Sequence, residues 1–299
     1  MPAESAGSAE SEWSLSAPEK IVFEGPVTAL DVSIVNGTVN VVGADGGPAR
    51  LELTALDGPP LKVVHQGGKL TVGYEDLTRK SRLGWFGRKN WSRSAGVTLT
   101  VPATADVEVG LVGASAVVSG IAGDTKVSGV SGDTTLVGIT GDVRTETVSG
   151  RVEAQRLGGD VRCNGVSGDL TLVECSGGRI KADSVSGNVV IDLAPAAPVV
   201  DLAVTTVSGE VAVRLPSSAD AAVDAGTTVG PVSCSFPELW VKDQFGSRNI
   251  TGRLGAGRGQ IKVTSVSGAV ALLQGPDPDD TADTDEWADY DAPAQGKVL

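Results

Sequence analysis

The sequence predicts an all-β protein whose chain winds into a single β-solenoid, similar to a β-helix, with coils of about 18 residues and two strands per coil. Three observations lead to this prediction. Glycine recurs every nine residues over a long central stretch, the residues between glycines alternate between apolar and polar, and no Phe, Tyr or Trp occurs from Val97 to Ser235. A globular core of this size normally uses aromatic residues because they bury the largest areas, whereas a thin two-layer coil has no room for them.

The central repeat combines two kinds of nine-residue unit. In one kind the glycine closes a Val-Ser-Gly triplet, and in the other an apolar residue or a cysteine lies two positions before the glycine. Between glycines the alternation has the period of two that is typical of a half-buried strand. The two kinds of unit alternate, so the full repeat is 18 residues. The glycines that mark it are Gly123, Gly132, Gly141, Gly150, Gly159, Gly168, Gly177 and, after one step of ten, Gly187.

An 18-residue unit with two strands and two glycine turns supplies one coil of a solenoid. Successive coils stack about 4.8 Å apart, so equivalent residues form rows along the solenoid. Cys175 takes an Ile or Leu place in the repeat, where it acts as a small buried hydrophobic residue. An antiparallel meander also explains the spacing of nine, but it does not explain the strict alternation of two units. The two expected internal rows are Val130, Val148, Val166 and Val185, and Ile121, Ile139, Leu157 and Cys175.

The prediction divides the chain into three parts. Residues 1–17 form a disordered N-terminal segment, residues 18–274 form the solenoid, and residues 275–299 form a disordered acidic tail. Between positions 276 and 293 the tail has eight acidic residues and no Lys or Arg, so it repels itself and has little to bury.

Two stretches of the solenoid depart from the repeat. Residues 77–94 form a loop insertion, and residues 231–259 form an irregular flank. The open edges of a terminal coil need to be covered, because they otherwise pair with other chains. We therefore expect Phe236, Trp240 and Phe245 of the flank to cap the end of the solenoid.

The N-terminus and the cysteines predict a cytoplasmic protein. Residues 1–13 are polar and acidic without the basic and apolar regions of a signal peptide, and no stretch approaches the roughly 18 apolar residues of a membrane span. The chain has three cysteines, an odd and small number that cannot form a disulfide framework and that fits a reducing compartment. They are Cys163, Cys175 and Cys234. The net charge of −13 argues against binding of nucleic acid or anionic lipid by the chain as a whole.

The repeat resembles a known bacterial family. Val-Ser-Gly units recur, a G-x-G-x-G-x-I-x-V-x-S-V-S-G segment closes the repeat at residues 255–268, and V-N-G-x-V-x-V opens it at residues 35–41. Over roughly residues 17–273 the chain resembles the toastrack β-strand-repeat domain, also labelled an adhesin domain, whose function is unknown. The resemblance implies a non-enzymatic β-solenoid and a link to envelope or membrane-stress signalling.

The segment from Leu77 to Ser94 has the most unusual composition in the chain. It carries six basic residues and no acidic residue, with three aromatic residues between them. Basic groups with interleaved aromatics suit an anionic membrane surface, a protein partner or, as a third choice, nucleic acid. The alternative is a surface loop whose aromatic residues fold back onto the end coils. The candidate binding residues are Arg79, Lys80, Arg82, Trp85, Phe86, Arg88, Lys89, Trp91 and Arg93.

No residue pattern predicts an enzyme, a metal site or a cofactor site. His65 is the only histidine and no nucleophile motif lies beside it, and the G-x-G-x-G run at residues 255–259 lacks the Lys-Ser/Thr ending of a phosphate-binding loop. With one Gly-Asp per unit, the aspartates fit exposed turn positions better than calcium ligands. The expected columns are Asp124, Asp142 and Asp160 followed by Arg179 on one edge, and Asp133, Arg151, Asp169 and Asn188 on the other.

The sequence therefore predicts a non-enzymatic interaction scaffold that contacts a protein partner or an anionic membrane surface through the loop at residues 77–94. The acidic tail could lie on this loop and mask it. Two alternatives stay open. One is a structural solenoid that assembles end to end, and the other is a β-helix that binds or processes carbohydrate.

Overall fold

The computed structural model describes residues 11–74, 92–195, 199–244 and 247–275, and these residues form strands in two sheets with no helix. Sheet 1 has, in spatial order, β1 (Ser11–Leu15), β6 (Leu61–Gln66), β7 (Lys69–Gly73), β3 (Ala29–Ile34), β9 (Asp106–Leu111), β11 (Thr125–Gly129), β13 (Val143–Thr147), β15 (Val161–Ser167), β17 (Arg179–Ser186), β19 (Asp201–Ser208), β25 (Gly259–Ser267), β21 (Ala221–Val229), β24 (Ser247–Leu254) and β23 (Trp240–Gln244). Sheet 2 has β2 (Glu19–Val22), β5 (Arg50–Asp57), β8 (Ser94–Pro102), β4 (Asn36–Ala44), β10 (Ser115–Ser119), β12 (Thr134–Ile139), β14 (Val152–Leu157), β16 (Leu170–Cys175), β18 (Val189–Leu193), β20 (Val211–Leu215), β26 (Val270–Gln274) and β22 (Val232–Cys234).

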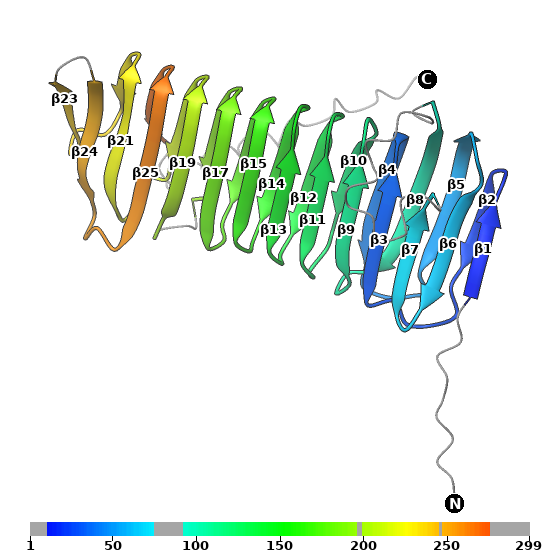
Figure 1. The fold of residues 1–299 in the computed structure, drawn as a ribbon. Helices are drawn as coiled ribbons and strands as arrows, with labels where there is room; N and C mark the ends of the chain where they lie inside the picture. The colour runs from blue at the N-terminus through cyan, green and yellow to red at the C-terminus, as the bar shows by residue number, and fades with distance from the viewer. Residues whose placement is uncertain (1–10, 75–91, 196–198, 245–246, 276–299) are drawn as a thin grey trace, which may run out of the picture.

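The middle of the molecule is a β-solenoid in which the chain alternates between the two sheets. From β9 to β20 each odd strand joins sheet 1 and each even strand joins sheet 2, and neighbours within a sheet are parallel (Figure 1). In sheet 1, Val107 pairs with Thr125 and Thr125 pairs with Val143, which is a step of 18 residues at each coil. This register confirms the predicted coil length, and the antiparallel meander is wrong for this region because every pairing in it is parallel.

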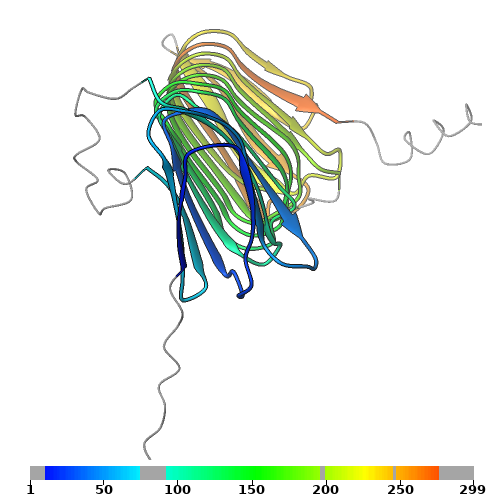
Figure 2. The same cartoon turned by 90° about the vertical axis from the view of Figure 1, so that its right-hand side faces the viewer.

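The core lies between the two sheets and is lined by Val, Ile, Leu, Ala and Thr side chains. Figure 2 looks along the solenoid and shows the coils as flattened loops stacked behind one another. The predicted row of Ile121, Ile139, Leu157 and Cys175 is confirmed, since each of these residues is at most 1% exposed. Cys175 is a buried free thiol in this row, as its place in the repeat predicts.

The predicted internal row of valines is wrong. Val148, Val166 and Val185 are each about half exposed, and Val130 is only partly buried. The reason is the parity of the strand, because residues separated by an even number of positions point to the same face of a sheet. Val148 lies four residues after the exposed Arg144, so it shares the outward face of Arg144 and not the inward face of Val143.

The Val-Ser-Gly turns are fixed by contacts between coils. Ser149 donates from its backbone N–H and its hydroxyl to the Val130 carbonyl of the preceding coil, and Ser167 donates in the same way to the Val148 carbonyl. The following glycine has a φ of +119° at Gly150, a left-handed conformation that other residues rarely adopt.

The C-terminal end has a chain order that the repeat does not predict. The last coil, β25 and β26, lies between the coil of β19 and β20 and the coil of β21 and β22 (Figure 1). The predicted irregular flank at residues 231–259 is wrong in part, because it contains β22, β23 and β24. Phe236 is buried as a cap residue should be, whereas Trp240 is 73% exposed on the outermost strand, and Phe245 lies outside the described residues.

The N-terminal end is covered by antiparallel strands. β1 pairs with β6 and β2 pairs with β5, so residues 11–15 of the segment predicted to be disordered form a strand, and only residues 1–10 lie outside the described part. Trp13 packs edge-on against Phe23, with ring centroids 5.4 Å apart, and Phe23 contacts His65. These aromatic residues close the end of the core where the parallel register stops.

Candidate functional site

Most of the predicted basic-aromatic loop lies outside the described residues. This applies to Arg79, Lys80, Arg82, Trp85, Phe86, Arg88, Lys89 and Trp91. The acidic tail from residue 276 onward also lies outside the described part, so the masking of the loop by the tail stays a prediction.

Arg93 is the one predicted binding residue that the structure places, and it is buried. It is 7% exposed, and its guanidinium carbon lies 4.4 Å from the centre of the Tyr74 ring, which is a cation–π contact. Asn36 donates a hydrogen bond from Nδ2 to the Arg93 carbonyl at 3.1 Å. Arg93 therefore anchors the base of the loop in a buried position, and its role in binding stays a prediction.

The loop is inserted at the edge of the solenoid where the Val-Ser-Gly turns lie. The loop begins after Tyr74, which directly follows β7, and it ends at Arg93, which directly precedes β8. Asn36, which donates to the Arg93 carbonyl, lies at the turn between β3 and β4. Gly113 donates to the Val35 carbonyl and Ser131 donates to the Val112 carbonyl, so these turns form one continuous column. We call this side of the molecule the VSG edge.

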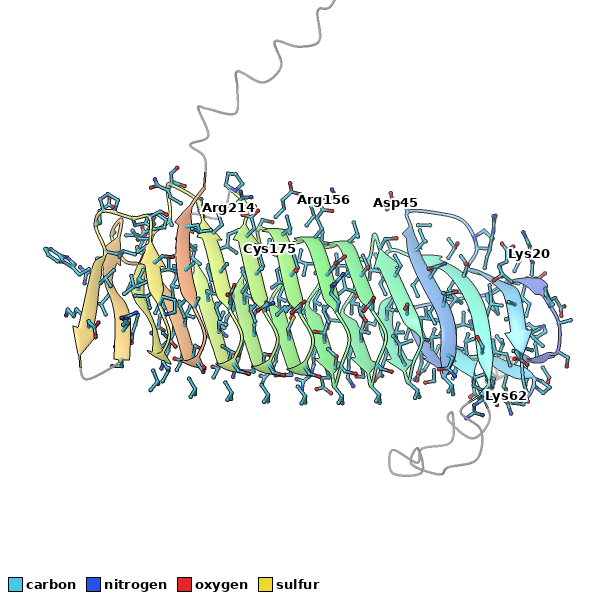
Figure 3. The ribbon with its side chains drawn as sticks, turned by 90° about the horizontal axis from the view of Figure 1, so that it is seen from above. Lys20, Asp45, Lys62, Arg156, Cys175 and Arg214 are labelled. Carbon is cyan, nitrogen blue, oxygen red and sulfur yellow. The ribbon has the colours of Figure 1, made fainter. Side chains whose placement is uncertain are left out.

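A row of exposed valines runs along the VSG edge. Val148, Val166, Val185, Val207 and Val266 are each 48 or 49% exposed, and we call these five residues the valine ridge. Figure 3 shows side chains projecting at regular intervals along the long edges of the solenoid. Contiguous apolar side chains on the surface mark interaction sites more often than isolated ones do. The ridge and the point where the loop is inserted therefore lie on the same edge.

A groove crosses the outer face of sheet 1, away from the VSG edge. Its volume is about 580 Å³, and it runs over β3, β9, β11, β13, β15 and β17, with Lys69 of β7 at one end. Four basic residues occupy equivalent positions in successive strands, Lys126, Arg144, Arg162 and Lys181, and we call them the cation row. The register places one cation on each strand, so the backbone positions of neighbouring cations are about 4.8 Å apart, which is the spacing between strands.

Three members of the cation row form ion pairs and one does not. Lys126 contacts Glu108 at 2.8 Å, Arg144 contacts Glu146 at 2.6 Å, and Lys181 contacts Asp183 at 3.3 Å. The hydrogen bond from Arg144 holds the pKa of Glu146 below its ordinary value, and the charges of Lys126 and Arg162 act in the same direction. Arg162 forms no ion pair with any residue that the structure describes. Asn164 stands at the position where β13 has Glu146 and β17 has Asp183.

The predicted aspartate columns are confirmed as turn residues. Asp124 accepts a hydrogen bond from the backbone N–H of Asp142, and Asp142 accepts one from Asp160 at 3.0 Å. Asp160 then accepts one from the backbone N–H of Arg179 at 2.7 Å. On the other edge, Asp133 accepts a hydrogen bond from the backbone N–H of Arg151, and Asp169 accepts one from that of Asn188. Each carboxylate therefore joins two coils. No cluster of three or more metal-ligating side chains occurs among the described residues.

The glycine run at residues 255–259 and His65 both make contacts that stabilise the fold. The glycine run at residues 255–259 connects β24 to β25, and Arg258 donates from its backbone N and from Nε to the buried Asp220, at 2.9 and 2.6 Å. These hydrogen bonds hold the pKa of Asp220 below its ordinary value. His65 packs against Phe23, and its Nε2 lies 3.2 Å from the Pro26 carbonyl. Among the described residues no helix is long and apolar enough to cross a membrane.

The chain belongs to the family described as Toastrack DUF4097, whose model matches residues 31–273. This match confirms the resemblance that the sequence shows and agrees with the two-sheet solenoid. No curated protein matches the chain significantly.

Three solved structures match most of the chain. One is provisionally named a cell adhesion protein, from Clostridium sporogenes, with 11% identity, a TM-score of 0.26 and coverage of 86% of this chain and 100% of that chain. Another is provisionally named a lipid-binding protein, from Parabacteroides distasonis, with 10% identity, a TM-score of 0.44 and coverage of 86% and 97%. The third is provisionally named an adhesin, from Bacteroides fragilis, with 10% identity, a TM-score of 0.39 and coverage of 90% and 98%.

Proposed function

We propose that this Toastrack protein is a non-enzymatic interaction scaffold that binds a partner protein along the VSG edge. The observation that supports the proposal is that the valine ridge and the base of the basic-aromatic loop share one edge. The ridge supplies apolar contact area, and the loop supplies charge and aromatic anchors, the combination found at protein interfaces. An anionic membrane surface is the alternative partner, with the loop as its contact.

A pair of matched variants tests this function. The ridge variant carries Val148→Thr, Val166→Thr and Val185→Thr, and the control variant carries Val42→Thr, Val117→Thr and Val190→Thr. The control valines are 41 or 42% exposed on sheet 2, so both variants change the same number of exposed valines. A third variant neutralises five basic residues of the loop and keeps the buried Arg93, and the five are Arg79, Lys80, Arg82, Arg88 and Lys89.

Partner capture from cell extract and sedimentation with anionic vesicles are measured for all variants. We expect the ridge variant and the loop variant to lose the same captured protein, while the control variant keeps it. Loss of vesicle binding by the loop variant alone would instead favour a membrane partner. Identical captured sets for all variants and the wild type would refute the VSG edge as the contact.

End-to-end assembly is a second candidate function because the C-terminal end exposes apolar surface. Trp240 is 73% and Val241 is 54% exposed on β23, the outermost strand of sheet 1. A terminal strand with unpaired backbone groups is a template for pairing with another chain. Sedimentation velocity over a range of concentrations would show growing species for assembly, and Trp240→Ser would abolish the growth.

We further propose that the scaffold works in the cytoplasm. The three cysteines are free, and two of them are buried in the core, where a disulfide would disturb the packing. Free thiols of this kind fit a reducing compartment.

A further inference from the structure

One end of the groove on sheet 1 combines two arginines with the carboxylate of Asp160. Arg162 on β15 and Arg179 on β17 both line the groove, and neither forms an ion pair with another described residue. Arg179 stands in the turn column where the preceding coils have Asp142 and Asp160. The chain therefore replaces an acidic turn residue by an arginine at the start of β17, the strand next to that of Arg162, which is the unpaired member of the cation row.

Carboxylates line the same groove next to these arginines. Asp124, Asp142 and Asp160 use Oδ1 to bind the backbone of the next coil, and their side chains are exposed to the groove. The groove thus presents a line of hydrogen-bond acceptors beside a line of cationic donors. Both lines repeat at the strand spacing, and the groove crosses five such steps, which is a length of about 24 Å.

This arrangement selects a particular ligand chemistry. Guanidinium groups bind carboxylates in a planar geometry with two hydrogen bonds, and aspartates accept hydrogen bonds from hydroxyl groups. The phosphate oxygens of a nucleic acid backbone or another polyphosphate only accept hydrogen bonds, so they offer no donor to the aspartates. A sugar chain with carboxylate groups instead offers acids to the arginines and hydroxyls to the aspartates.

We infer that the groove on the outer face of sheet 1 binds a linear acidic polysaccharide, a polyuronate, with Arg162 and Arg179 holding its carboxylates. Asp142 and Asp160 accept hydrogen bonds from the sugar hydroxyls, and the extended chain of sugars lies across the strands. This inference does not rest on the proposed function of the VSG edge, because the groove lies on a different surface.

Calorimetric titration of the full-length protein with oligogalacturonate tests the inference. We expect saturable binding, and we expect the double substitution Arg162→Gln and Arg179→Gln to weaken it by at least about tenfold, because each lost contact is a hydrogen bond between charged groups. The matched control carries Arg50→Gln and Lys262→Gln, two exposed cations that do not line the groove, with Lys262 in the same register as the cation row. The control should bind as the wild type does. Arg162→Lys and Arg179→Lys should restore part of the affinity.

Three results would overturn the inference. The first is the absence of saturable binding to oligogalacturonate by the wild type. The second is an equal loss of affinity in the groove variant and the matched control, which would show attraction by net charge only. The third is binding of single-stranded DNA as tight as that of oligogalacturonate and equally dependent on Arg162 and Arg179. Thermal unfolding of each variant separates loss of binding from loss of fold, and a ridge variant that still binds the sugar separates this site from the VSG edge.

Discussion

Two columns of residues on opposite edges of the solenoid adopt the same sign of φ and yet differ in the residues that they accept. On the VSG edge, Gly132, Gly150 and Gly168 have φ of +106°, +119° and +122°. On the other edge, the column reads Gly120, Gly138, Arg156 and Glu174, with φ of +67°, +63°, +55° and +56°. We call the second column the bulge column, because the pairing in sheet 2 skips the residue at this position.

The two columns differ in the space available for a Cβ atom, and not only in backbone conformation. A Cβ atom on Gly150 would meet the backbone carbonyl of Gly132 in the preceding coil, and one on Gly168 would meet that of Gly150. A Cβ atom on Gly138 would meet nothing within 4 Å. Figure 3 shows Arg156 of the bulge column projecting away from the solenoid. Positive φ alone therefore does not require glycine in this fold, whereas close contact between coils does.

The largest expected effect is a loss of stability from a methyl group in the tight column. Gly168→Ala should destabilise the protein by roughly 3 kcal/mol, because a left-handed alanine is strained and its Cβ collides with the Gly150 carbonyl. The measurement is thermal and urea unfolding beside Gly138→Ala, whose Cβ would lie in open space. Equal losses for the two variants would show that the columns do not differ in packing.

A second prediction uses the buried thiols, which report on the two edges separately. Cys163 lines a small cavity with Gly150 and Gly168 of the VSG edge, and Cys175 directly follows Glu174 of the bulge column. Burial raises the pKa of each thiol to about 11, and reagents attack the thiolate. At pH 8, far below this pKa, both thiols stay protonated.

We therefore expect labelling of native protein at pH 8 to be about a hundredfold slower at Cys163 and Cys175 than at the half-buried Cys234, with Cys163 slowest of the three. Mass spectrometry after alkylation, with urea-unfolded protein as the reference, gives the three rates. Faster labelling of Cys163 than of Cys175 would mean that the VSG edge opens more readily, contrary to its tighter packing.

The sequence allows the solenoid to be predicted because glycine spacing and strand alternation are local properties. The inward row of Ile121, Ile139, Leu157 and Cys175 follows from that spacing. The outward position of Val148 follows from the sequence as well, since its even distance from Arg144 puts both residues on one face. The cation row was also visible as basic residues at steps of 18, 18 and 19, although only the register brings them to one groove.

The remaining differences depend on contacts that the sequence does not display. β25 lies between β19 and β21 because it packs against both strands, and this packing is a contact between distant parts of the chain. Residues 231–259, which precede most of β25, break the repeat and so hide this order in the sequence. Arg156 and Glu174 adopt a left-handed conformation, and no glycine at these positions marks it in the sequence. Arg93 is basic like its neighbours in the loop, and only its contact with Tyr74 shows that it is an anchor.

A smaller effect tests the hydrogen bonds that join the turns of the tight column. Ser167 donates from Oγ to the Val148 carbonyl at 3.1 Å, so Ser167→Ala should cost about 1 kcal/mol of stability. Ser128→Ala is the control, because Ser128 lies within β11 and not in a turn that joins two coils. Unfolding in urea measures both, and no difference between them would mean that the serine hydroxyls add nothing to the backbone bonds.

The smallest effect is expected in the bulge column, where two coils have glycine and the next two have Arg156 and Glu174. Arg156→Gly removes the strain of a left-handed non-glycine residue, but it also increases the entropy of the unfolded chain, and the two effects oppose each other at similar size. The exposed arginine side chain contributes little because it projects into solvent. We therefore expect the stability to change by less than about 0.5 kcal/mol, which urea unfolding with repeated measurements resolves. A loss as large as that of Gly168→Ala would show that Arg156 makes a contact essential to the fold, and the contrast between a closed and an open column would then be wrong.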